Sequence, residues 1–162
     1  MKHIKFLMAA LAVIFCIQTL TTTLPPSCER QEKESWTLLT NDVITTVYHA
    51  VPAQCNADCL HTASMMTIHP DKLEKQRILA MERTMMKQYG IHYGDIVKIE
   101  GTSQYDGVWQ VQDTMNKRFA GQHKIDLLIP VGAKMGKWTN VTIYKAADRN
   151  TAEKYSKQMK IS

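Results

Sequence analysis

Short segments rich in β-branched residues recur from residue 43 onward, and they limit the possible folds more than any other feature. The segments cover residues 43–48, 78–81, 95–100, 108–112, 125–129 and 141–145. Several of them alternate apolar and polar side chains, as strands with one buried face do. Turn residues, such as the pair Asp106 and Gly107, separate them. The pattern predicts a small barrel or sandwich, with short helical turns near residues 69–75 and 84–89.

The first 28 residues predict a leader for export to the periplasm or cell envelope. Lys2 and Lys5 precede an apolar stretch at 6–20, the order found in secretory signal peptides. A signal anchor in the membrane is the alternative, if residues 21–24 extend the stretch. Ser27 and Cys28 precede a charged run and resemble a bacterial lipoprotein cleavage site, which would make Cys28 the lipidated residue. Otherwise the leader is a plain signal peptide and Cys28 is a free thiol. Residues 29–41 are then interpreted as a polar tether, 42–146 as the folded domain and 147–162 as a polar tail.

The remaining cysteines are interpreted by compartment. Cys16 lies inside the leader, which leaves Cys28, Cys55 and Cys59. Export permits a disulfide, and Cys55 and Cys59 are close enough in sequence to form one. The alternatives are two thiols, or a metal site completed by His61. A structural zinc site normally shows two pairs of ligands and only one pair is evident, so no metal or other cofactor is expected.

The net charge excludes a nucleic-acid-binding role. The 162 residues carry 20 basic and 15 acidic side chains, a formal charge of +5. Removal of the leader takes away two lysines and no acid, which leaves 18 basic against 15 acidic residues, or +3. No run of basic residues interleaved with aromatics is present. The length fits one domain, and a monomer is expected.

Two aspartates stand out by their position relative to the predicted strands. Asp113 directly follows one strand and Asp126 lies inside another. Aspartate is depleted in strands, and two such acids can face each other across a groove. Apolar neighbours and a second carboxylate both raise a carboxyl pKa, which suits a general acid. The alternative is structural, with Asp126 facing water on an edge strand and Asp113 capping a turn.

The order of the segments resembles a known family. Thr46-Val47-Tyr48, Thr62-Ala63-Ser64, Leu79-Ala80-Met81-Glu82, Gly94-Asp95, Gln112-Asp113-Thr114 and Ile125-Asp126-Leu127 follow one another as in the 3D domain, named for three aspartates, of bacterial cell-wall proteins. Its double-psi β-barrel also occurs in membrane-bound lytic transglycosylase A, rare lipoprotein A and the expansins. The resemblance covers residues 45–145, and its best motif is the pair Asp113 and Asp126.

The resemblance implies an all-β, six-stranded double-psi β-barrel with short helical insertions and a groove for peptidoglycan glycan strands. It implies that Asp126 protonates the glycosidic oxygen and then activates the sugar's own 6-hydroxyl, giving a 1,6-anhydro product. Asp113 would orient or tune Asp126. Further groove residues expected from it are Tyr48, Thr62, Ser64 and Glu82. Trp109 and Trp138 would either stack on sugars or pack in the core.

The sequence departs from the family at two places. Glu82 stands where the first family aspartate usually lies, and Met115 and Asn116 stand where glycines commonly follow the second. A loop without those glycines brings its backbone less close to a ligand. The alternatives to an enzyme are therefore a non-catalytic peptidoglycan-binding or wall-remodelling lipoprotein that uses the same groove, and a lipoprotein whose barrel only binds a partner.

Overall fold

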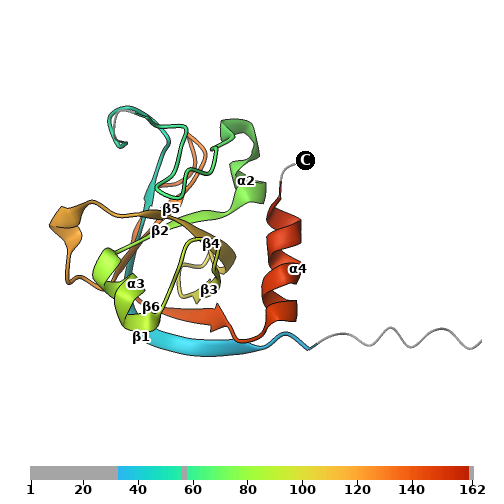
Figure 1. The fold of residues 1–162 in the computed structure, drawn as a ribbon. Helices are drawn as coiled ribbons and strands as arrows, with labels where there is room; N and C mark the ends of the chain where they lie inside the picture. Colours follow the sequence, from blue (N-terminus) through green and yellow to red (C-terminus); the bar gives the residue numbers. More distant parts are fainter. Residues whose placement is uncertain (1–32, 56–57, 161–162) are drawn as a thin grey trace, which may run out of the picture. The chain divides into compact units, whose positions relative to one another are not determined.

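The computed structural model describes residues 33–55 and 58–160 (Figure 1). The predicted leader and Cys28 lie outside the described residues. The strands are β1 (Trp36–Tyr48), β2 (Ile78–Met81), β3 (Ile96–Glu100), β4 (Gly107–Thr114), β5 (Lys124–Leu128) and β6 (Lys137–Ala146). The helices are η1 (Pro70–Lys72), α2 (Leu73–Gln76), α3 (Arg83–Tyr89), η2 (Lys117–Phe119) and α4 (Arg149–Met159). Among the helices of these residues, none has the length and hydropathy needed to span a membrane.

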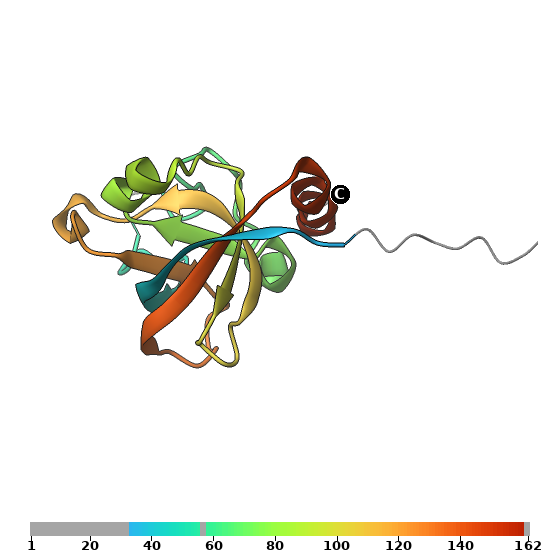
Figure 2. The same ribbon diagram turned by 90° about the horizontal axis from the view of Figure 1, so that it is seen from below.

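Within the described residues, the strands close into a barrel in the order β1-β5-β2-β4-β3-β6 (Figures 1 and 2). The pairs β1–β5 and β2–β4 are parallel and the other pairs are antiparallel. Exchanging β1, β2 and β3 with β4, β5 and β6 leaves both the order and the directions unchanged. The barrel therefore consists of two interlocked halves of the same topology. The predicted six-stranded double-psi β-barrel with short helical insertions is confirmed.

The barrel encloses the hydrophobic core, to which every strand contributes. In β5 the side chains of Ile125 and Leu127 are fully buried, whereas Asp126 between them points to the other face. Leu79 on β2 is also fully buried and pairs with Leu127. The period of two in the sequence thus separates core residues from residues available for a site.

β1 begins earlier than predicted, inside the segment interpreted as a tether. The strand starts at Trp36 and pairs along β6, with Trp36 opposite Ala146. The backbone N–H of Ala147 donates to the carbonyl of Ser35 at 2.9 Å. The tether prediction was therefore wrong for residues 36–41. The apolar residues Trp36, Leu38 and Leu39 do not alternate with polar ones, and the hydrogen-bonding partner of this strand lies at the far end of the sequence.

The C-terminal segment is a docked helix rather than a loose tail. Asp148 caps α4 by accepting from the N–H of Thr151, and Thr151 and Met159 are buried. Glu34 accepts hydrogen bonds from Lys154 and from the hydroxyl of Tyr155, each at 2.7 Å. These two bonds lower the pKa of Glu34 to about 2. The helix thus holds the start of β1 in place.

Candidate functional site

One row of side chains crosses four neighbouring strands of the barrel. Thr46 on β1 pairs with Asp126 on β5, which pairs with Ala80 on β2. Ala80 in turn pairs with Asp113 on β4. The two acids are thus separated by a single alanine, whose small side chain leaves space between them. Both acids line the same pocket, as the predicted groove requires.

Asp113 reaches this row only because β4 contains a β-bulge. Leu79 pairs with Val111, but the next residue, Ala80, pairs with Asp113, so Gln112 is an extra residue in β4. Strict alternation would place Asp113 on the face of Val111, which is fully buried in the core. Bulges re-aim side chains in this way. The carbonyl of Gln112 instead accepts the N–H of Ser64 at 3.1 Å, which attaches the long loop after β1 to the barrel.

Asp126 is a carboxyl group with a strongly shifted proton affinity. Desolvation by burial raises its pKa from 3.8 to about 6. The negative charge of Asp113 also raises this pKa, whereas the hydrogen bond from Thr46 (2.9 Å to Oδ1) and the charge of Lys124 lower it. Near neutral pH Asp126 therefore exchanges a proton readily, as a general acid and base must.

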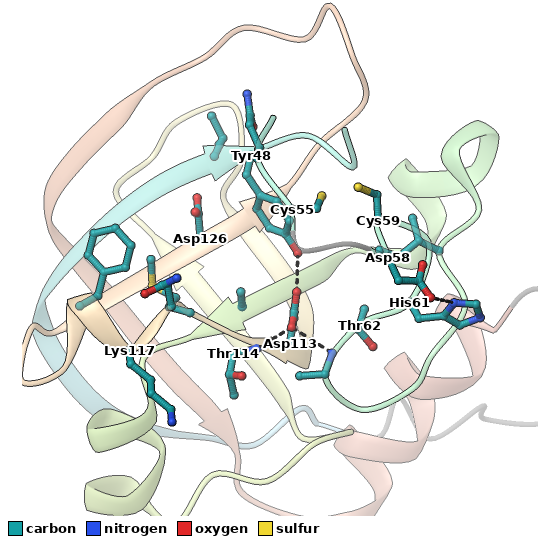
Figure 3. A pocket seen from close by; sticks show the side chains of 18 of the residues that line it. Tyr48, Cys55, Asp58, Cys59, His61, Thr62, Asp113, Thr114, Lys117 and Asp126 are labelled. Carbon is teal, nitrogen blue, oxygen red and sulfur yellow. Dashed lines mark hydrogen bonds and ion pairs between the residues drawn. The ribbon is translucent and has the colours of Figure 1, made fainter. Parts of the chain in front are cut away.

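Asp113 differs from Asp126 in that three donors occupy both oxygens of its carboxylate. Its Oδ1 accepts from the backbone N–H of Ala63 (3.0 Å) and of Thr114 (2.8 Å). Its Oδ2 accepts from the hydroxyl of Tyr48 at 3.1 Å (Figure 3). Burial and the nearby Asp113 raise the pKa of Tyr48 well above 10, so this hydroxyl stays a donor. Because Tyr48 comes from β1, its side chain reaches across β5 and β2 to β4.

The pocket above the row has a volume of about 1,040 Å³ and two unlike walls (Figure 3). One wall is the loop after β1, which contributes Cys55, Asp58, Cys59, His61, Thr62 and Met65. The other is the connection from β4 to β5, which contributes Met115, Asn116, Lys117, Arg118 and Phe119. Met65 has a positive φ of 66° and a side chain that is 76% exposed at the rim. A pocket of this volume lies at the upper end of the range for small-molecule sites.

Of the residues predicted to line the groove, Tyr48 and Thr62 do so. The hydroxyls of Thr62 and Ser64 are hydrogen bonded at 2.9 Å. Ser64 lies outside the pocket lining, and its hydroxyl donates to the side chain of Gln112 at 2.7 Å. It therefore fixes the loop to the bulge rather than facing a ligand, which corrects its predicted role.

Of the two roles predicted for Trp109, the structure shows packing in the core, so its assignment as a substrate-binding residue was wrong. Its side chain is 3% exposed, and its Nε1–H donates to the carbonyl of Tyr105 at 3.0 Å. The guanidinium of Arg77 lies 4.1 Å from the ring centroid and covers it. The alternation of β4 places Trp109 on the same face as Val111, so the sequence contained the signal for a core position. Trp138 packs edge-on against Tyr105 and does not line the pocket.

Glu82 does not lie in the groove either, because it caps α3. Its carboxylate accepts from the backbone N–H of Thr84 (2.7 Å) and of Met85 (2.9 Å), and its side chain is 2% exposed. Burial alone would raise the pKa of Glu82, but the hydrogen bonds from Thr84 and Met85 outweigh it and the pKa is lowered. The predicted contact with substrate is thus corrected to a structural role at a helix N-terminus.

Replacing Glu82 by alanine is expected to lower the free energy of unfolding by about 1–2 kcal/mol, the usual cost of losing an N-cap. The loss should shrink as the pH falls through the lowered pKa of Glu82, because protonation already removes the carboxylate in the wild type. Urea denaturation at pH 7 measures it. The control is Glu74→Ala, an exposed acid in the first turn of α2. Equal stability of the two variants would contradict the capping role.

The predicted disulfide between Cys55 and Cys59 is not formed, although both residues belong to the described part of the chain. The Sγ of Cys55 instead donates to the carbonyl of His49 at 3.5 Å. Burial and the neighbouring thiol of Cys59 raise the pKa of Cys55 to about 11, so it is a poor nucleophile at neutral pH. Both cysteines lie in the wall of the pocket. Across residues 33–55 and 58–160, no cluster of three or more metal-ligating side chains is found.

Several residues of the site had no distinct signal in the sequence. Thr46 is one of two adjacent threonines in β1, and only the register shows that it faces Asp126. Ala80 lies between the two acids, and its small side chain leaves the space between them open. The basic residues of the second wall follow Asp113 closely in sequence, but no motif distinguishes them from surface lysines and arginines.

Comparisons with known proteins place few constraints on function. No family model matches the chain, and no curated protein sequence matches it. Among solved structures, the chain is similar to the computationally designed msDPBB_sym2 protein, a double-psi β-barrel. The likeness covers 65% of this chain and 99% of the designed one, at 17% identity and a TM-score of 0.33. The strand pairing described above, and not this likeness, carries the fold assignment.

Proposed function

We propose that the protein binds a glycan strand in this pocket and cleaves it with Asp126 as the single general acid and base. The observation that carries the proposal is the pKa of about 6 for a carboxyl group in the lining of an open pocket. A carboxyl group of this kind is protonated often enough to protonate a glycosidic oxygen and ionised often enough to act next as a base.

The contacts of Asp113 favour a one-acid mechanism. Glycosidases that use two carboxylates need the second as a nucleophile or as a base for water. Both oxygens of Asp113 are already engaged by Ala63, Thr114 and Tyr48. Asp113 is therefore a positioning residue, which holds Tyr48 and the loop and adds negative charge near Asp126.

The reaction balances without water. Protonated Asp126 donates its proton to the glycosidic oxygen as the bond from that oxygen to C1 of the sugar breaks. The Asp126 carboxylate then takes the proton of the 6-hydroxyl of the same sugar while that oxygen bonds to C1. The products are a new hydroxyl end and a 1,6-anhydro sugar, and Asp126 recovers its proton. This is the lytic transglycosylase reaction that the resemblance to the 3D domain implies.

The substrate in this proposal is bacterial peptidoglycan, and the protein acts in the cell envelope. The sequence of the leader supports export, either as a soluble protein or as a lipoprotein attached to the outer membrane through Cys28. A monomer is sufficient, because all residues assigned to the reaction come from one chain.

Incubation of the protein with purified peptidoglycan tests the proposal. The expected products are muropeptides with 1,6-anhydro ends, which borohydride does not reduce and which are one water lighter than hydrolysed fragments by mass spectrometry. A muramidase digest, with reducible ends, is the control. Reducible products would indicate a hydrolase instead. Pelleting with the wall and no product would support the non-catalytic binding protein.

A further inference from the structure

The pocket wall between β4 and β5 carries positive charge without matching acids. Lys117 and Arg118 on η2 and Arg83 at the start of α3 all line the pocket and are exposed. None of the three forms an ion pair with an acidic side chain of the described residues. Elsewhere on the surface, Lys98 and Lys145 are each paired with an acid at 2.7 Å. The charge at the pocket is therefore left available to a ligand.

An aromatic ring holds part of this charge in position. The ring of Phe119 lies 4.8 Å from the guanidinium of Arg118 and 4.1 Å from the ammonium of Lys124. Contacts of a cation with a ring face are favourable and do not neutralise the charge. Phe119 itself lines the pocket. Arg118 is thus placed beside the binding site without an ion-paired acid among the described residues, and Lys124, whose charge acts on Asp126, contacts the same ring.

The backbone of this wall is well fixed. The side chain of Asn116 accepts from the N–H of Arg118 at 3.0 Å, and the N–H of Ala120 donates to the carbonyl of Lys117 at 3.0 Å. After the turn, the carbonyl of His123 accepts from the N–H of Ile44 at 2.8 Å. The loop is thus attached to β1 at its far end, and the cations present a defined surface.

The opposite wall carries one acid, Asp58, whose carboxylate is hydrogen bonded to the ring of His61 at 2.7 Å. Asp58 lines the pocket on the side of the cysteine loop, and Asp113 lies in the floor. A ligand with one negative group is attracted to η2 and repelled from the cysteine loop. Complementary charges of this kind fix the register of a ligand more than they add affinity.

We propose that Lys117, Arg118 and Arg83 form a subsite for a carboxylate carried by the glycan. The inference rests on the proposed function in that the ligand is a glycan strand, and it adds which residues bind an acidic group of that strand. Arginine presents paired N–H groups that match the two oxygens of a carboxylate, which favours this group over a neutral hydroxyl. The carboxylate sits either on a sugar, as in the lactyl ether of N-acetylmuramic acid, or on an attached peptide.

Binding measurements with an uncleaving protein test the subsite. The protein carries Asp126→Asn, and the probe is an oligomer of N-acetylglucosamine and N-acetylmuramic acid without peptides. Its matched partner is the same oligomer with the carboxylates converted to amides. Calorimetry should show the acidic oligomer binding about tenfold more tightly, from a few exposed charge pairs. Raising the NaCl concentration from about 50 to 300 mM should reduce this preference.

The cations are tested by changing Lys117 and Arg118 together to glutamine. This variant should lose most of the preference for the acidic oligomer, and Arg83 accounts for the part that remains. The control is Lys72→Gln with Lys75→Gln, which removes two exposed charges on η1 and α2, away from the pocket. Phe119→Leu keeps an apolar side chain and should lose part of the preference, which separates the placement of the cations from their presence.

Each outcome decides a separate question. Equal binding of the acidic and amidated forms by the parent protein, both without and with stem peptides, overturns the subsite. A preference that the glutamine changes leave undiminished also overturns it. A preference seen only when stem peptides are attached supports it and places the carboxylate on the peptide. Cleavage of peptidoglycan by the wild type without any charge preference leaves the proposed function standing and removes the subsite. Charge preference without cleavage supports the subsite and contradicts the proposed cleavage of glycan.

Discussion

Replacing Asp126 by asparagine is expected to lower the rate of glycan cleavage by about 10²–10⁴-fold, the usual contribution of a general acid and base. Asparagine keeps the size of the side chain. It also keeps an oxygen that can accept the hydrogen bond from Thr46, which is 2.9 Å long in the wild type. The loss is therefore one of proton transfer rather than of shape. In the wild type, cleavage should decline above pH 6, because the acid with a pKa of about 6 is then ionised.

The same change should make the protein more stable at neutral pH. A carboxyl pKa raised from 3.8 to about 6 means that the folded state binds the proton more tightly than the unfolded state. This contribution to stability is full below about pH 4 and is lost as the pH rises through 6. At pH 8 the ionised Asp126 lowers the free energy of unfolding of the wild type by up to about 3 kcal/mol. The uncharged asparagine does not cause this loss.

Urea denaturation of both proteins at pH 4 and pH 8 measures this effect. The advantage of Asp126→Asn should be small at pH 4 and largest at pH 8. The control is Asp42→Asn, which removes the same charge from an exposed position on β1 outside the pocket. Lower stability of Asp126→Asn at pH 8, or retained cleavage, would remove Asp126 from the proposed role.

Replacing Leu127 by alanine is expected to lower the free energy of unfolding by about 2–5 kcal/mol. Leu127 is fully buried in the barrel, next to Asp126 in sequence and opposite Leu79 on β2. Truncation removes apolar contacts and leaves a cavity that the closed barrel cannot easily collapse. The control is Leu60→Ala, because the side chain of Leu60 is 47% exposed in the loop. A loss below about 1 kcal/mol would contradict the packing of Leu127 in the core.

The strands nearest the site could be predicted from the sequence because their residues carry local signals. β2, β5 and the second half of β1 are rich in apolar and β-branched residues, and their predicted positions agree with the structure. The first half of β1 lacks this signal, since its side chains lie mostly on an exposed surface. Its partner, β6, is more than one hundred residues away in the sequence, so only the tertiary structure fixes it.

The sequence was sufficient to predict which two acids belong to the candidate site, but not how the strands place them. Asp113 and Asp126 share a pocket as expected, yet Asp113 faces it through the extra residue Gln112 in β4. Nothing local in the sequence marks a bulge at this position. Glu82 was misplaced for a related reason, because an acid at the end of a strand can equally serve as the cap of the next helix. The burial of Trp109, in contrast, follows from the alternation of β4 alone.

The interlocked halves of the barrel also determine when the chain can fold. Within residues 33–55 and 58–160, β1 pairs only with β5 and β6, and β2 pairs only with β4 and β5. β3 likewise pairs with β4 and β6. No strand of the first half therefore has a partner within that half, so no stable sheet forms until the second half is synthesised. Contacts of such long sequence separation are slow to form. A nascent chain of this topology therefore cannot complete its barrel until β4, β5 and β6 have all been synthesised.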